Sequence, residues 1–205
     1  PAAADRGSNG LTRAGVAGMG LALAMALAAC GSGGSDAAVS ASEAGGSILA
    51  AGDDRGRAYP PEDRPVVPEI SGELLDGSAY SLSDHAGSVV VLNFWGSWCG
   101  PCRAEAPELQ QVYEATRAGG VEFLGVNVKD QRPLALAFVA NKGLEFPSLF
   151  DTGGSVALQL RQTPPNAIPS TLVLDRRHRV AAVWLGPVSA EQLQPVVTAL
   201  AEEAA

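Results

Sequence analysis

After residue 65, continuous apolar runs alternate with segments that repeat apolar residues at helical spacing. The apolar runs, residues 88–94 and 121–128, are rich in β-branched residues and predict strands buried on both faces, as in the centre of a parallel sheet. The helical segments, residues 99–118 and 133–142, each stop at glycine, a common helix terminator. The alternation predicts a parallel β-α-β-α arrangement.

Weaker patterns flank this arrangement. Within residues 70–82, Asp76-Gly77 is a turn signal that predicts a β-hairpin. Further on, the patterns predict a short helix and then two strands separated by a polar turn; they cover residues 155–161, 171–174 and 180–185. The expected fold class is α/β: a central mixed β-sheet flanked by helices on both faces, with an N-terminal β-hairpin extension.

An amphipathic helix is predicted at the C-terminal end, beginning near Ser189. Its apolar face is formed by residues at helical spacing, namely Leu193, Val196, Val197 and Leu200. Pro195 lies inside this segment, where proline removes a helical hydrogen bond. The pattern therefore predicts either a late start or a kink.

The first 29 residues have the pattern of a secretory signal peptide. Arg6 and Arg13 precede the uncharged apolar run 16–29, which is shorter than the ~20 residues that a membrane-spanning helix needs. The run ends in Leu27-Ala28-Ala29-Cys30, which resembles the lipobox of bacterial lipoproteins. The resemblance implies that Cys30 is lipidated and becomes the new N-terminus. The alternative is an ordinary signal peptide cut at small residues, with Cys30 incidental.

The next segment, residues 30–58, is expected to be a flexible linker. It lacks apolar periodicity and contains mainly Gly, Ser, Ala and scattered charges. Residues 59–205 then form the one domain that a chain of 205 residues accommodates. A lipid on Cys30 would tether this domain to a membrane through the linker.

The charge balance is acidic, with a formal net charge of −8, and 46% of the residues are hydrophobic. A nucleic-acid-binding domain would need a basic patch, and the sequence contains none, so nucleic acid is not expected as a partner. We expect a monomeric globular domain with an apolar core.

The chain contains three cysteines, and an odd number leaves one without an intramolecular partner. Cys99 and Cys102 lie in a Trp-Cys-Gly-Pro-Cys motif where a buried strand leads into a helix. The free N–H groups and partial positive charge of a helix start stabilise a thiolate. We therefore expect Cys99 to be the exposed nucleophile with a low pKa. Cys102, one turn on, is expected to be more buried and to resolve the mixed disulfide, while Pro101 suits an early helical position.

Other roles for this motif are less consistent with the sequence. A structural zinc site takes four ligands, and the remaining candidates, Cys30, His85 and His178, are isolated, so both histidines are interpreted as surface residues. Haem attachment requires a histidine after the second cysteine, where Arg103 stands. A disulfide that closes so short a loop would stabilise the fold little. Redox chemistry is therefore favoured.

The segment from Asn93 to Pro107 resembles the active-site segment of the TlpA/ResA-like branch of the thioredoxin superfamily. The resemblance covers roughly residues 66–205 and implies a thioredoxin fold, with Pro107 as its helix-kinking proline. It also implies that Pro169 is cis and faces the two cysteines. The backbone of Ile168 would then be open to an extended substrate strand, as in β-augmentation.

The resemblance further concerns two polar positions. Thioredoxins carry a buried Asp where this chain has Asn93, and the TlpA/ResA-like branch commonly has Asn there and a Glu at the place of Glu105. Because Glu105 lies three residues after Cys102, the two share a helix face. Its carboxylate would raise thiol pKa values and carry a proton. The alternative is a solvated glutamate paired with Arg103 or another base.

Two tryptophans flank the turn before the cysteines. Trp95 is expected to pack in the core. Trp98 is expected to be half-exposed beside the thiol, as a contact surface for partners. Together with the motif and the resemblance, this gives an expected client-contacting set of Trp98, Gly100, Pro101, Ile168 and Pro169.

The first hypothesis is an extracytoplasmic, membrane-anchored thiol–disulfide reductase that a membrane thiol donor re-reduces. The resemblance implies clients such as apocytochrome c. No cofactor is expected beyond the Cys99–Cys102 disulfide. The first alternative is an oxidase of secreted proteins, since direction depends on the reduction potential. The second is a non-catalytic copper-binding assembly factor, although such proteins have a CxxxC spacing and a distant histidine. A peroxidase is not favoured, because Gly96 and Leu92 stand where it would need a hydroxyl residue and a proline.

Overall fold

The computed structural model describes residues 56–160 and 167–203. The predicted signal peptide, Cys30 and all but the last residues of the predicted linker lie outside the described residues, as does the end of the predicted short helix at Arg161. In the part of the chain that is described, no helix has the length and apolar character to cross a membrane.

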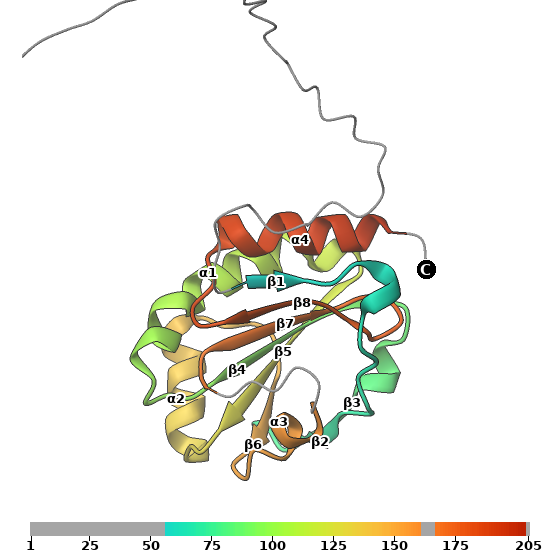
Figure 1. Cartoon of the computed structure of the whole chain (residues 1–205). Coiled ribbons are helices and arrows are strands. Elements are labelled where there is room, and N and C mark those ends of the chain that lie inside the picture. Colours follow the sequence, from blue (N-terminus) through green and yellow to red (C-terminus); the bar gives the residue numbers. More distant parts are fainter. Residues whose placement is uncertain (1–55, 161–166, 204–205) are drawn as a thin grey trace, which may run out of the picture. The chain divides into compact units, whose positions relative to one another are not determined.

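Six strands form one mixed sheet, in the order β1-β8-β7-β4-β5-β6 (Figure 1). Strands β4, β5 and β6 are parallel, whereas β7, β8 and β1 join the sheet by antiparallel pairing. The bounds are β1 Gly56–Ala58, β4 Val89–Trp95, β5 Val121–Val128, β6 Ser148–Asp151, β7 Ser170–Leu174 and β8 Val180–Leu185. The predicted parallel core is confirmed.

The side chains of β4 alternate between two apolar layers. Val89 and Val91 pack against residues of α1 and α4, and Trp95 packs against α2. Val90 and Leu92 face the opposite layer, which the hairpin, a 3-10 turn and α3 cover. Helices therefore lie on both faces, but the three long ones share one face.

The elements outside the sheet are short except for those three helices. The helices are α1 Gly100–Thr116, α2 Arg132–Lys142, α3 Ser155–Gln159 and α4 Ala190–Glu202. The hairpin consists of β2 Ser71–Glu73 and β3 Ala79–Ser81, and the 3-10 turns are η1 Pro61–Asp63, η2 Leu82–His85 and η3 Arg117–Gly119. The predicted hairpin is confirmed: Asp76 accepts the N–H of Ser78 in its turn, and Gly77 has a φ of 91°.

The sequence patterns do not predict strands β1 and β6. Residues 56–58, assigned to the end of the linker, pair with β8 at the edge of the sheet, so the ordered domain begins before residue 59. Strand β6 is only four residues long and pairs with β5 through Ser148–Asp151. Its apolar content is too small for a periodic signal.

Helix α4 begins at Ala190 although Pro195 lies inside it. Ser189 accepts the N–H of Gln192 at 3.3 Å, and the Gln192 side chain accepts the N–H of Ser189 at 3.0 Å. This capping box satisfies two backbone groups at the helix start. The predicted late start is therefore wrong.

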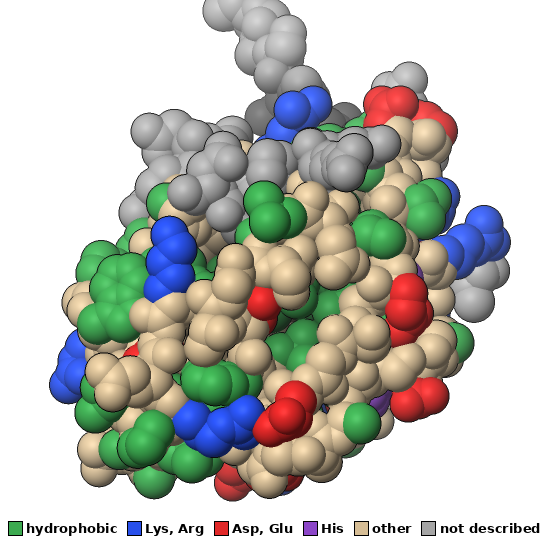
Figure 2. All heavy atoms as spheres, turned by 90° about the horizontal axis from the view of Figure 1, so that it is seen from below, with side chains coloured by type: hydrophobic (Ala, Val, Ile, Leu, Met, Phe, Trp, Pro, Cys, Tyr) green, Lys and Arg blue, Asp and Glu red, His purple; other side chains and the backbone are tan. Residues whose placement is uncertain are grey.

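Figure 2 shows one face of the molecule, on which hydrophobic side chains lie in patches between acidic and basic ones. The large apolar side chains that are exposed among the described residues are Val66, Trp98, Leu134, Leu136, Leu158 and Leu185. Trp98 is the only aromatic residue in this set. It lies directly before Cys99, at the C-terminal end of the parallel strands.

Candidate active site

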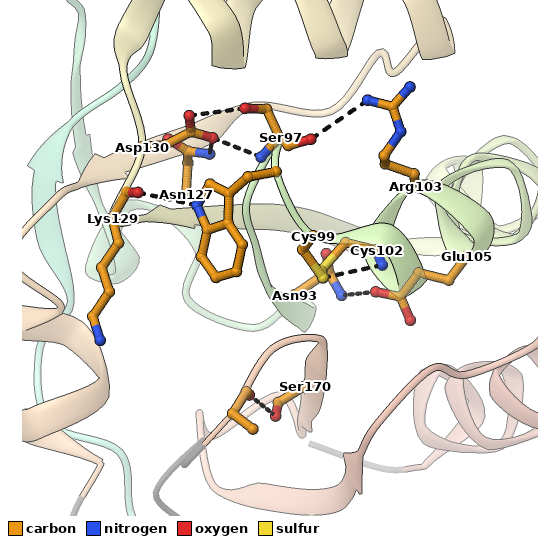
Figure 3. Close-up of a disulfide and its surroundings, with 12 residues drawn as sticks. Asn93, Ser97, Cys99, Cys102, Arg103, Glu105, Asn127, Lys129, Asp130 and Ser170 are labelled. Atoms are coloured by element: carbon orange, nitrogen blue, oxygen red, sulfur yellow. Dashed lines mark hydrogen bonds between the residues drawn. A yellow bond between two sulfur atoms is a disulfide. The ribbon is translucent and has the colours of Figure 1, made fainter.

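The two cysteines form a disulfide at the start of helix α1 (Figure 3). Their Cα atoms are 5.3 Å apart. Cys99 is the N-cap residue, and its sulfur accepts the backbone N–H of Cys102 at 3.2 Å. Pro101 occupies an early helical position, where its missing N–H leaves no bond unmade. The predicted placement at a helix start is confirmed, so the partial positive charge of α1 acts on the Cys99 sulfur.

The prediction that Cys99 is exposed is wrong for the disulfide form. Cys99 is 5% exposed and Cys102 is 2% exposed. The reason is an apolar cluster that surrounds the pair and includes Ala135 and Phe138 of α2. The residues on either side, Trp98 and Gly100, are exposed. Cys99 is therefore covered although its two neighbours in the sequence are at the surface.

The two neighbouring tryptophans have the environments predicted for them. Trp95 is buried, stacks on Phe138 with ring centroids 4.7 Å apart, and donates to the Ser148 hydroxyl. Trp98 is 59% exposed, and its indole N–H donates to the carbonyl of Lys129 at 3.0 Å. The exposed ring beside the disulfide provides an apolar contact surface.

Glu105 is buried, with 3% of its surface exposed. One carboxylate oxygen accepts the Asn93 amide at 2.9 Å, and the other accepts the backbone N–H of Val188 at 3.1 Å. The Asn93 amide also donates to the Thr171 hydroxyl at 3.0 Å. The alternative of a solvated glutamate paired with Arg103 is therefore wrong.

The environment of Glu105 changes its acidity. Burial raises the pKa of Glu105 to about 7, and the hydrogen bonds from Asn93 and Val188 offset only part of this shift. A carboxyl group with this pKa exchanges its proton near neutral pH, which suits a general acid or base.

The loop before β7 carries the second predicted part of the site. The Ile168–Pro169 peptide bond is cis, as the resemblance implies. Ile168 is half-buried and packs against the apolar cluster that contains both cysteines. A Cβ atom on Gly96 would lie 3.3 Å from the Ile168 Cδ1 atom and 2.8 Å from the Trp98 indole nitrogen, so this loop and the tryptophan meet above Gly96.

The position of Asp130 beside the active-site turn is not among the features predicted from the sequence. This residue follows β5 and accepts hydrogen bonds from the Ser97 backbone and hydroxyl at 2.6 and 2.8 Å. A signal was available, because the carboxyl ends of neighbouring parallel strands meet at one edge of the sheet. A carboxylate two residues after the end of β5 is therefore expected near the turn after β4.

The two histidines lie in a separate part of the molecule and are not free surface residues. The His178 ring nitrogen lies 3.2 Å from the His85 carbonyl, and the His85 ring stacks on Tyr80 at 5.0 Å. Among the residues that the structure describes, no group of three or more His, Cys, Asp and Glu side chains is arranged to hold a metal ion.

The chain matches a protein-family model and several known proteins. The model of the AhpC/TSA family matches residues 65–183. The thiol–disulfide oxidoreductase ResA of Geobacillus kaustophilus is 33% identical over 129 residues, which are 63% of this chain and 72% of that protein.

Two solved structures are also similar. A secreted thiol–disulfide isomerase from Corynebacterium glutamicum is 39% identical, with a TM-score of 0.70 over 75% of this chain and 96% of that one. A thiol:disulfide interchange protein of the thioredoxin family from Chlorobium tepidum is 26% identical, with a TM-score of 0.62 over 67% and 97% of the two chains. The predicted thioredoxin fold is confirmed.

Proposed function

Since the chain belongs to the AhpC/TSA family and is a thiol–disulfide oxidoreductase of the ResA-like kind, we propose that it reduces disulfides of client proteins outside the cytoplasm through Cys99 and Cys102. The Cys99 thiolate attacks one sulfur of a client disulfide, and the other client sulfur leaves as a thiolate. The Cys102 thiolate then attacks Cys99, releases the second client thiol and forms the Cys99–Cys102 disulfide. Two electrons pass to the client, and a membrane thiol donor returns them to the protein.

One observation carries this proposal: the Cys99 sulfur accepts the Cys102 N–H at the first turn of α1. A helix start favours the thiolate over the thiol. The same hydrogen bond keeps Cys102 one turn away, within bonding reach of Cys99. The attacking and resolving roles follow from this order along the helix.

Glu105 is proposed to accept the Cys102 proton when that thiol becomes the resolving thiolate. Its carboxyl is buried on the helix that carries both cysteines, and its raised pKa allows proton exchange near neutral pH. Asn93 and Val188 hold the carboxyl in place from two other elements.

Client binding is proposed at the surface around Cys99. Trp98, Gly100 and Pro101 are exposed there, and the half-buried Ile168, followed by the buried Pro169, is proposed to form the opposite side of the site. Pairing of the Ile168 backbone with an extended client strand is part of this proposal. Because Cys99 itself is buried, the client sulfur has to enter between these two sides.

The location and the clients belong to the same proposal. The similar protein of Corynebacterium glutamicum is described as secreted, which supports action outside the cytoplasm. Lipidation of Cys30 would tether the domain to the membrane. Apocytochrome c is proposed as a client because its haem-binding cysteines must be reduced before haem is attached.

Trapping tests the exchange mechanism. In the full chain, Cys102→Ser is expected to hold clients as mixed disulfides on Cys99, and mass spectrometry identifies them. The double variant Cys99→Ser/Cys102→Ser is the matched control and should hold none. If Cys102→Ser traps no protein in cells under either reducing or oxidising conditions, the proposed mechanism is wrong.

The direction of electron flow requires a separate measurement. Thioredoxin has a potential of about −270 mV and the oxidant DsbA about −120 mV. Equilibration with glutathione is expected to place this protein nearer the first value. A potential above roughly −150 mV would support the oxidase alternative instead. Lipid labelling of the wild type but not of Cys30→Ser would support the anchor.

A further inference from the structure

The loop between β5 and α2 holds the turn that precedes Cys99 (Figure 3). Asp130 lies in this loop, and its carboxylate accepts four hydrogen bonds. One oxygen accepts the Ser97 hydroxyl and the Gln131 N–H, both at 2.8 Å. The other accepts the Ser97 N–H at 2.6 Å and the Asn127 amide at 2.9 Å. The carboxylate therefore connects the end of β5, the start of α2 and the turn after β4.

The donors to Asp130 are all neutral groups. Burial would raise the pKa of Asp130, but the hydrogen bonds from Asn127 and Ser97 outweigh it and hold the pKa below its usual value. The group is therefore an ionised anchor at neutral pH and is poorly suited to exchange protons.

Asn127 shows how strongly the carboxylate directs its surroundings. This side chain is completely buried, and its amide oxygen has no hydrogen-bond partner among the described residues. The amide nitrogen faces Asp130, because the oxygen in that place would face the carboxylate charge. A buried acceptor without a partner is unfavourable, so the bond to Asp130 fixes the amide orientation despite that cost.

The residue between these two completes the support. Lys129 has a φ of 50°, a conformation that is uncommon for a residue with a side chain. Its carbonyl accepts the Trp98 indole N–H at 3.0 Å. On the other side, Arg103 donates to the Ser97 carbonyl at 3.4 Å. Figure 3 shows Ser97 lying between Asp130 and Arg103.

We propose that Asp130 is a positioning residue, which fixes Ser97 and Trp98 and thereby holds Cys99 at the start of α1 in the orientation for attack. The inference rests on the proposed roles of Cys99 and Cys102 and extends them to a residue 31 positions away in the sequence. Asp130 acts through the two residues directly before Cys99 and does not itself touch the reacting sulfur atoms in this role.

Two substitutions in the full-length chain separate positioning from charge. Asp130→Asn removes both the negative charge and part of the hydrogen-bond set, whereas Ser97→Ala removes one hydrogen bond and no charge. We expect both to lower kcat for insulin reduction, Asp130→Asn by roughly 10- to 100-fold, since small misplacements of a reacting group have effects of that size. KM should change less than kcat. Ser97→Thr keeps the hydroxyl and should restore the rate.

Alkylation of reduced Cys99 by iodoacetamide at pH 7 is the second measurement, because it does not depend on a client. We expect it to slow in both variants as Cys99 loses its alignment with the helix start. If Asp130 acted only through its charge, Asp130→Asn would lower the pKa of Cys99 and speed alkylation, and Ser97→Ala would behave as wild type. That result would overturn the inference.

Asp175→Asn is the matched control. Like Asp130, Asp175 accepts two backbone N–H groups, from Arg177 and Arg179, but it is buried and lies in the turn between β7 and β8. The Asp175→Asn variant should be less stable than wild type, but its Cys99 should be alkylated at the wild-type rate. If Asp130→Asn behaves the same way, Asp130 is only structural and the inference is wrong. If wild type reduces no protein disulfide while alkylation still slows in both variants, the proposed function fails and the positioning role stands.

Discussion

The carboxylate of Glu105 lies 2.9 Å from the amide nitrogen of Asn93, and both side chains are buried beside the helix turn that carries the disulfide. The Asn93 amide takes the place of water as a hydrogen-bond donor to the Glu105 carboxylate, a group that proteins seldom bury. The second carboxylate oxygen is bonded to the Val188 N–H, close to the start of α4. The pair therefore joins β4, α1 and the segment before α4 behind the reacting sulfurs.

The stability of the oxidised protein is expected to depend on the ionisation of Glu105. Its pKa is about 7 in the folded state and 4.5 ordinarily. Between these values the folded state binds more protons than the unfolded state, so the free energy of unfolding falls as pH rises from 4.5 to 7 and then levels off. The pKa difference corresponds to about 3 kcal/mol.

Glu105→Gln should remove this slope, because glutamine does not ionise. Its amide nitrogen would face a donor, either the Asn93 amide or the Val188 N–H, so we expect the variant to be less stable than wild type near pH 4.5. The difference should shrink as pH rises to 7, because only wild type loses stability over this range; guanidinium unfolding of the disulfide form measures it. Glu108→Gln is the control, since Glu108 is on the same helix and accepts the Ala190 N–H at 2.9 Å but is only half-buried. A Glu105→Gln curve as steep as that of wild type would contradict the prediction.

The strands with continuous apolar runs could be predicted from the sequence, and the bounds of β5 and β8 match the prediction to the residue. Burial on both faces leaves little choice of residue in such strands. Strand β6 has only four residues and so lacks this signal. Its pairing depends on β5 supplying an open edge, which the sequence of β6 does not encode.

The site was predictable where one local motif determines it, as for the two cysteines at the helix start. The burial of Cys99 was not, because Ala135 and Phe138 cover it from a different helix. The same holds for Glu105, whose bond to Val188 spans 83 positions. Contacts between distant segments depend on the packing of whole elements, and residue spacing carries no information about them.

Gly96 is expected to tolerate no side chain. A Cβ atom there would lie 2.8 Å from the Trp98 indole nitrogen, so Gly96→Ala should displace the ring and break its bond to Lys129. If Trp98 contacts clients, kcat/KM for insulin reduction should fall roughly tenfold, mainly through KM. Gly119→Ala is the control, because a Cβ atom there meets nothing within 4 Å. Equal kinetics and tryptophan emission for Gly96→Ala and wild type would contradict this expectation.

Pro195 is expected to destabilise helix α4. It is exposed within the helix and has no N–H to donate to the preceding turn. Pro195→Ala should raise the free energy of unfolding by about 1–3 kcal/mol, after allowing for the greater freedom of the unfolded chain. Pro133 is the control, since it lies in the first turn of α2, where the missing N–H has no cost. Pro133→Ala should therefore give no gain, and a Pro195→Ala variant no more stable than wild type would contradict the prediction.

Arg64 is expected to contribute far more to stability than an exposed arginine does. Its side chain is 2% exposed, and it donates to Asp175 at 3.2 Å and to the two Glu203 oxygens at 2.6 and 2.8 Å. These bonds connect the segment after β1 with the turn between β7 and β8 and with the end of α4. Arg64→Ala removes one of the cationic partners of the buried Asp175 carboxylate. The free energy of unfolding should therefore fall by about 3–5 kcal/mol.

Arg117→Ala is the matched control for Arg64→Ala. Arg117 pairs with Glu145 at 3.0 Å, but the two side chains are 52% and 55% exposed. Water and salt screen such a pair, so its loss should cost little stability. Urea unfolding of both variants at low and at 0.5 M added NaCl compares them, and salt should reduce only the smaller effect, since buried pairs are screened much less. Similar losses for the two variants would show that the buried ion cluster at Arg64 is no stronger than a surface pair.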